Sequence, residues 1–131
     1  MSYFLDSDTC VYYLNGAYPA LSAQFKASRP QQIKIPAMVM AEMLTGAAKG
    51  ARMTRGIWAQ FAAPFEIVPF GGAAARQYAA VRAYLEKNGE SIGPNDLVIA
   101  ATVLANGGVL ITRNTKEFSR VPPPDIEDWT I

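Results

Sequence analysis

Residues 2–9 have the sequence SYFLDSDT, in which a short apolar run stops abruptly at an acid. The run at residues 3–5 is typical of a buried strand, because it is apolar, partly aromatic and bounded by polar residues. Asp6 ends the run, and Asp8 and Thr9 follow, both of which favour turns and helix caps. Two interpretations are open here. One of the acids caps the next helix, or the acids belong to a ligand site at the carboxyl edge of a parallel sheet.

Strand-like and helix-like segments alternate along the rest of the chain. Short apolar runs predict further strands at residues 33–35, 66–68 and 109–112, with a short edge strand at 125–129. Helical patterns predict helices at residues 9–15, 19–28, 37–48, 54–63, 72–88 and 94–106. Because no linker or repeat interrupts this alternation, the sequence predicts one α/β domain over residues 1–131, with helices flanking a mostly parallel sheet.

Polar residues recur near the same ends of these elements. Glu42 lies in the first half of the helix after the second strand, and Asp96 lies in the first turn of the helix before the fourth strand. Asn114 and Glu117 follow the fourth strand. Taken singly, Glu42 is an ordinary exposed helix residue and Asp96 complements a helix dipole. Crossover helices of a parallel sheet begin at its carboxyl edge, however, so all four residues are expected to join Asp6 in one site.

The composition excludes several kinds of chemistry. The chain has 131 residues and no His, which excludes His-based general acid–base catalysis, Ser–His and Cys–His pairs and His-ligated zinc. Its 12 basic and 11 acidic residues give no global signature for nucleic-acid binding. Cys10 is the only cysteine, so no internal disulfide exists, and no apolar run approaches the length of a membrane span. We therefore expect a cytoplasmic protein without a membrane partner.

The predicted cluster of acids requires a cation or protons. Carboxylates that share a pocket repel one another, so either some of them are protonated or a cation joins them. Ligand sets made only of oxygen favour Mg²⁺ or Mn²⁺ over zinc. The sequence therefore predicts a site for Mg²⁺, with Mn²⁺ as the alternative ion.

Four segments resemble the PIN-domain ribonucleases, specifically the VapC-type toxins of toxin–antitoxin pairs. They are FLDSD at residues 4–8, AEMLTG at 41–46, IGPNDLVIAA at 92–101 and TRNTKEF at 112–118, and the resemblance covers nearly the whole chain. It implies a three-layer fold with a central five-stranded sheet. It also implies a homodimer and a small VapB-type antitoxin that occludes the acidic groove.

The resemblance implies an Mg²⁺-dependent endoribonuclease that cleaves RNA phosphodiester bonds with a metal-activated water. Its targets would be tRNA-like or rRNA-like, and cleavage would inhibit translation and growth until the antitoxin binds. Asp6, Glu42 and Asp96 would hold the metal, and Asn114 would complete the catalytic set.

The chain departs from the family pattern at two positions. Asn114 stands where the family usually has a fourth acid, and Asp8 stands where the family more commonly has Asn. Glu117 or Asp8 is therefore the candidate to supply the missing charge, and Glu117 is a possible metal ligand.

Basic residues lie beside this cluster in the sequence. Arg113 and Lys116, with Thr112, are candidate substrate-binding residues, and Arg120 is a further candidate for phosphate contact. A second basic stretch is either a solvated helix connection or a phosphate-contacting patch, and it comprises Lys49, Arg52 and Arg55.

Two other functions are alternatives to the ribonuclease. The segment at residues 6–8 resembles the opening motif of haloacid-dehalogenase phosphatases, but Cys10 stands where that motif has Thr or Val, and no later Gly-Asp-x-x-x-Asp follows. The other alternative is a PIN-like module that binds RNA or a partner without turnover, which Asn114 in place of an acid leaves open.

Overall fold

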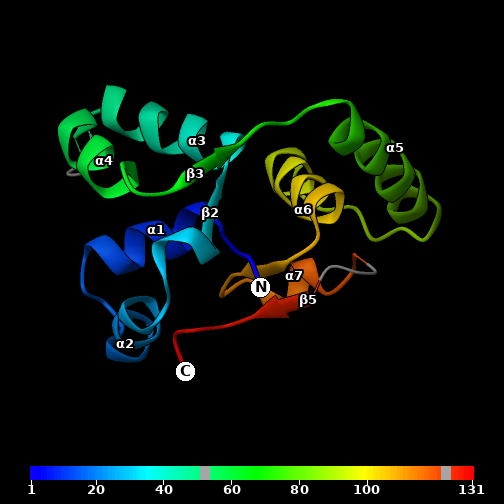
Figure 1. Ribbon diagram of the computed structural model, residues 1–131. Coiled ribbons are helices and arrows are strands. Elements are labelled where there is room, and N and C mark those ends of the chain that lie inside the picture. The colour runs from blue at the N-terminus through cyan, green and yellow to red at the C-terminus, as the bar shows by residue number, and fades with distance from the viewer. Residues whose placement is uncertain (51–53, 122–124) are drawn as a thin grey trace.

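The computed structural model describes residues 1–50, 54–121 and 125–131 (Figure 1). The strands are β1 (Tyr3–Leu5), β2 (Ile33–Pro36), β3 (Glu66–Val68), β4 (Val109–Ile111) and β5 (Asp125–Glu127). The helices are α1 (Ser7–Leu14), α2 (Pro19–Ala27), α3 (Ala37–Ala48), α4 (Arg55–Ala62), α5 (Gly72–Lys87), α6 (Pro94–Asn106) and α7 (Thr115–Phe118), with a 3₁₀ turn at Pro30–Gln32.

The sheet has five parallel strands in the order β3-β2-β1-β4-β5, which confirms the predicted fold class. The central strand is β1, in which Tyr3 pairs with Ile33 of β2 on one side and with Val109 of β4 on the other. Phe4 and Leu5 are fully buried, as expected for a strand covered on both faces. In Figure 1, α5 and α6 lie together at one end of the molecule, and α1 to α4 gather at the other.

The strand order changes direction between β1 and β4. The chain leaves β1 toward β2 and β3 on one side, and it leaves β4 toward β5 on the other. Open α/β sheets bind ligands outside the carboxyl ends of the strands at such a switch point, because the outgoing segments diverge there. Asp6 follows β1 and Thr112 follows β4, so both lie at this point.

Helix α1 begins earlier than the sequence predicted. The prediction placed the helix at residues 9–15, whereas α1 spans Ser7–Leu14. The reason is that Asp6 has extended backbone and its side chain accepts from the Thr9 N–H, which makes Asp6 the N-cap. The four-residue helix α7 was not predicted, since its sequence is too short for a helical period to be seen.

Gly108 permits the close approach of β4 to β1. A Cβ atom at this position would lie 2.8 Å from the backbone oxygen of Ser2 and 2.8 Å from the Phe4 ring. We therefore expect Gly108→Ala to lower the free energy of unfolding by about 1–3 kcal/mol, as overpacking does. Gly71→Ala is the control, because nothing lies within 4 Å of its Cβ position; since Gly71 is the N-cap of α5, its substitution should cost no more than a few tenths to about 1 kcal/mol. Equal denaturation midpoints for the two variants would contradict this account.

Within the described residues, no helix has the length and apolar character that crossing a bilayer requires. Arg52, which the sequence placed in a possible basic patch, lies outside the described residues.

A candidate active site at the carboxyl edge of the sheet

Asp6 is buried at the end of β1, and its two carboxylate oxygens have different partners. Oδ1 accepts a hydrogen bond of 2.9 Å from the Thr9 N–H and so caps α1. Oδ2 accepts from the Thr112 hydroxyl, which reaches across from the end of β4. Burial raises the pKa of Asp6 above its usual value, although the hydrogen bonds from Thr112 and Thr9 act in the opposite direction. Asp6 therefore serves as a helix cap and also lies at the switch point.

Glu42 extends from α3 toward the same edge, where two other elements hold its carboxylate. The Ser7 hydroxyl at the start of α1 donates to Oε1 at 2.6 Å. The Asn95 amide at the start of α6 donates to Oε2 at 3.4 Å. Glu42 is thus the point where α1, α3 and α6 meet.

Asp96 lies in the first turn of α6, and its surroundings disfavour the charged form of its carboxyl group. Its pKa is raised to about 6, mainly because its partial burial disfavours the charged form. Repulsion adds to this effect, in decreasing order, from four other carboxylates: Glu117, Glu42, Asp6 and Asp8. Among the described residues, the two ion pairs present involve other acids. The Asp96 charge is therefore left uncompensated by this part of the chain.

Asn114 and Glu117 form a pair at the start of α7. The Asn114 amide donates to Glu117 Oε2 at 2.8 Å, and the Gly93 N–H donates to Oε1 at 3.0 Å. These two hydrogen bonds lower the pKa of Glu117, so it stays ionised. The Gly93 contact also joins α7 to the loop that precedes α6. Asn114 thus supports Glu117, which carries the negative charge on this side of the cluster.

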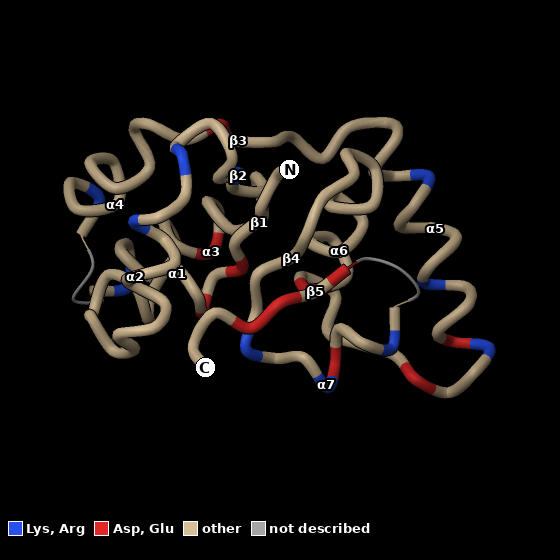
Figure 2. Tube along the Cα trace, turned by 60° about the horizontal axis from the view of Figure 1, so that its bottom comes forward, with Lys and Arg blue, Asp and Glu red and all other residues tan. Residues whose placement is uncertain are grey.

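Five acids make up the carboxylate cluster: Asp6, Asp8, Glu42, Asp96 and Glu117. Figure 2 shows acidic positions gathering where α1, α3 and the end of β1 meet. Their donors are all oxygen, which suits Mg²⁺ or Mn²⁺. In the described part of the chain, no three acids are arranged to hold an ion as they stand. The carboxylates of Glu42 and Glu117 are instead hydrogen-bonded to protein donors, Ser7 and Asn95 for Glu42 and Gly93 and Asn114 for Glu117.

Of the predicted substrate-binding residues, Arg113 and Lys116 are exposed beside the cluster, and Arg113 places its guanidinium 5.3 Å from the centroid of the Tyr18 ring. Arg120 instead donates to the Ser91 carbonyl at 3.2 Å, so it fixes the loop before α6. Thr112 is 1% exposed and donates to Asp6. It lies behind the Asp6 carboxylate and not on an accessible surface, so its role in substrate binding stays a prediction.

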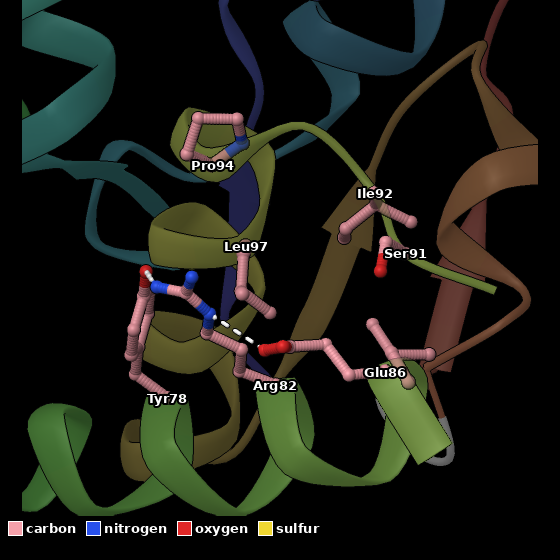
Figure 3. A pocket seen from close by; sticks show the side chains of 8 residues that line it. Tyr78, Arg82, Glu86, Ser91, Ile92, Pro94 and Leu97 are labelled. Atoms are coloured by element: carbon pink, nitrogen blue, oxygen red, sulfur yellow. Dashed lines mark hydrogen bonds and ion pairs between the residues drawn. The ribbon is translucent and has the colours of Figure 1, made fainter. Parts of the chain in front are cut away.

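A separate pocket of about 300 Å³ lies between α5 and α6 (Figure 3). Leu85, Leu97 and Ile92 line it with apolar surface. At its rim, Arg82 donates to Glu86 at 3.1 Å and to the Tyr78 hydroxyl at 3.1 Å, so these polar groups satisfy one another. No member of the carboxylate cluster is among its lining residues. This pocket is therefore not the candidate active site.

Four residues contribute to the site that sequence reasoning did not single out for it. Ser7 and Asn95 hold Glu42, Thr9 donates to Asp6, and Gly93 donates to Glu117. Ser7 and Asn95 each stand next to a predicted acid in the sequence, which is the only signal that marked them. Their hydrogen bonds to Glu42 span 35 and 53 residues, a separation that no local pattern encodes.

A parallel α/β sheet with a cluster of carboxylates at its switch point defines a recognisable class of protein. The chain belongs to the PIN-domain family, whose model matches residues 3–123. Relatives that match along their full length bear the name VapC. The chain is 32% identical to ribonuclease VapC2 of Rickettsia felis over 98% of both chains. It is 28% identical to the tRNA(fMet)-specific endonuclease VapC of Salmonella typhimurium, again over 98% of both chains.

A solved structure agrees with these relatives. The chain superposes on a chain of the crystal structure of VapBC2 from Rickettsia felis bound to a promoter DNA fragment, with a TM-score of 0.89 and 32% identity. The match covers 98% of this chain and 99% of that chain. The resemblance inferred from the sequence motifs is thereby confirmed.

Proposed function

We propose that this protein is an Mg²⁺-dependent endoribonuclease that acts as the toxin of a VapBC-type pair. The observation that supports metal dependence is the repulsion between the charge of Asp96 and four neighbouring carboxylates, which a cation would relieve. The full-length similarity to proteins named VapC ribonuclease supports RNA as the substrate. The relative solved as VapBC2 supports a VapB-type antitoxin as the partner.

Asp6, Glu42 and Asp96 would hold the metal, with Glu117, and Asn114 through its amide oxygen, as additional ligands. When bound, Mg²⁺ supplies Lewis-acid stabilisation of phosphate charge and lowers the pKa of water. Hydrogen bonds within the chain support this proposal, because they fix the carboxylates of the proposed ligands. Thr112 and Thr9 orient Asp6, Ser7 and Asn95 orient Glu42, and Gly93 orients Glu117.

Substrate is held by the basic residues beside the cluster. Arg113 and Lys116 are exposed and follow β4, so they lie at the same edge as Asp6. Their charges would offset the repulsion between RNA phosphates and the carboxylate cluster. The proposed target is a tRNA-like or rRNA-like molecule, and the proposed compartment is the cytoplasm. We also propose that the active form is a homodimer.

Purified protein incubated with total RNA tests the activity. Cleavage is expected with Mg²⁺, with loss of activity in EDTA and recovery with excess Mg²⁺ or Mn²⁺. The products should carry 5′-phosphate and 3′-hydroxyl ends, which ligation-based sequencing detects. RNA binding without cleavage, under every metal condition, would favour the binding-module alternative that Asn114 leaves open.

The role of Glu117 is a separate prediction. Glu117→Ala removes the carboxylate that contributes most of the charge repulsion on Asp96. We therefore expect it to weaken Mg²⁺ binding about tenfold, as does the loss of a residue that supports a metal ligand. Asn114→Asp adds charge and should keep or tighten binding. Calorimetric titration with Mg²⁺ measures both, and Glu86→Ala is the control because Glu86 pairs with Arg82 away from the cluster. Unchanged affinity in both test variants would restrict the metal site to Asp6, Glu42 and Asp96.

A further inference from the structure

A groove of about 380 Å³ runs along the exposed face of α3 and begins at the carboxylate cluster. Glu42 and Asn95 line one end of it, and Lys49 lines the other. Glu42, Thr45, Gly46 and Lys49 share one face of the helix because they are spaced by three, four and seven residues. A rise of 1.5 Å per residue separates Glu42 from Lys49 by about two turns, or roughly 10 Å.

Small side chains make up part of the groove's lining, together with the half-buried Met38. Ala41 and Thr45 are exposed, and Gly46 lies beside them. Small residues allow a ligand backbone to approach the helix closely. The lining is also polar where it meets the cluster, since Asn95 donates to Glu42 there. This differs from the pocket lined by Tyr13, Phe25 and Phe61, whose aromatic surface suits an apolar partner.

Lys49 supplies the only basic side chain of this groove's described lining. It is exposed, and the ion pairs found among the described residues involve Lys34 and Arg82 instead. Its charge therefore remains available to an anion. A lysine at the end of a helix also complements the helix dipole, and this simpler role has to be separated by experiment. Lys26 provides that comparison, since it is exposed in the last turn of α2.

We propose that this groove holds the RNA strand on one side of the cleaved bond, with Lys49 contacting a phosphate that neighbours the one at the carboxylate cluster. The proposal rests on the proposed ribonuclease function and specifies how its substrate lies. Two features support RNA as the occupant. The groove is continuous with the cluster through Glu42 and Asn95, and its far end is positive where a polyanion would leave the acidic edge.

The first test measures binding without metal. The anisotropy of a labelled single-stranded RNA is followed in EDTA across a series of salt concentrations, for the wild type, Lys49→Gln and Lys26→Gln. Lys49→Gln is expected to weaken binding several-fold and to reduce the slope of log affinity against log salt by about 0.7, the value for one phosphate contact on a single strand. Lys26→Gln is expected to match the wild type. Equal effects of the two substitutions would overturn the proposal.

The second test uses substrate length. A chromogenic phosphodiester with a single phosphate cannot reach Lys49, so Lys49→Gln should hydrolyse it at the wild-type rate while cleaving a longer RNA more slowly. An equal loss on both substrates would overturn the assignment of Lys49 to a neighbouring phosphate. Failure of the wild type to cleave either substrate, with binding still dependent on Lys49, would contradict the ribonuclease function and leave the groove assignment supported.

A third variant separates RNA from a second copy of the chain as the occupant. Thr45→Trp fills the exposed floor of the groove and is expected to weaken RNA binding without changing the mass found by analytical ultracentrifugation. A change in mass with RNA binding intact would overturn the proposal and identify this face as an interface between copies.

Discussion

Glu42→Gln is expected to abolish RNA cleavage while leaving the fold intact. The amide keeps an oxygen that can accept from Ser7, but it removes the charge that would hold a cation. The loss of activity should exceed the roughly 10- to 100-fold that follows loss of a supporting partner of a metal ligand. The melting temperature should be unchanged or higher, because Glu42 is one of the carboxylates that repel Asp96. Initial cleavage rates and thermal melts, both recorded with and without Mg²⁺, measure the two effects.

Glu66→Gln is the matched control for this substitution. Glu66 begins β3, at the opposite edge of the sheet, and pairs with Lys34 at 2.8 Å. Surface ion pairs contribute little, so its loss should cost less than about 1 kcal/mol of stability and leave cleavage near the wild-type rate. Wild-type activity of Glu42→Gln in metal-supplemented buffer would remove Glu42 from the site.

Asp96→Asn is expected to stabilise the metal-free protein and to abolish cleavage. The pKa of Asp96 is about 6 in the folded protein, against a usual value of 3.8. A group whose pKa is raised by folding contributes stability below its unfolded pKa, and this stability is lost as the pH rises through its folded pKa. At pH 7 the charged Asp96 therefore destabilises the fold. Since Asp96 is partly exposed and its charge is screened by solvent, Asp96→Asn should raise the free energy of unfolding at pH 7 by about 1–2 kcal/mol.

The pH dependence identifies the cause. In EDTA, the difference in unfolding free energy between Asp96→Asn and the wild type should be largest above pH 7 and should disappear near pH 4, where the wild-type carboxyl is protonated. Addition of Mg²⁺ should raise the melting temperature of the wild type more than that of the variant. If Asp96 only complemented the dipole of α6, Asp96→Asn would lower stability slightly and cleavage would persist, so the sign of the change decides between the two roles.

The sequence predicted the fold because the relevant signals are local. The apolar runs at β1 and β4 stop at polar residues, and the parallel direction of the strands, with crossover helices that begin at the carboxyl edge, then brings Asp6, Glu42, Asp96 and Glu117 to that edge. The first turn of α1 was harder to predict, since Asp6, Asp8 and Thr9 are all acceptable caps. Only the structure shows that Asp6 accepts from Thr9 and thereby starts the helix at Ser7.

The arrangement of side chains inside the site was beyond a single sequence. Thr112 and Asp6 are 106 residues apart, and their contact depends on the register of β1 against β4. The same register buries Thr112, a feature that sequence patterns did not show, and its role in substrate binding stays a prediction. Asn114 was expected beside the metal, and the structure adds that its amide donates to Glu117. Such pairings depend on side-chain rotamers, which sequence periodicity does not encode.

The central position of β1 also links the site to the order of synthesis. β1 emerges early from a ribosome, yet its pairing with β4 has to wait until more than a hundred further residues have been translated. Contacts of such long sequence separation slow folding, because a large loop must close before they form. A nascent chain that stops before Thr112 lacks the hydroxyl that donates to Asp6 and one neighbour of the central strand. Premature termination within the first hundred residues would therefore release a polypeptide without an assembled carboxylate cluster.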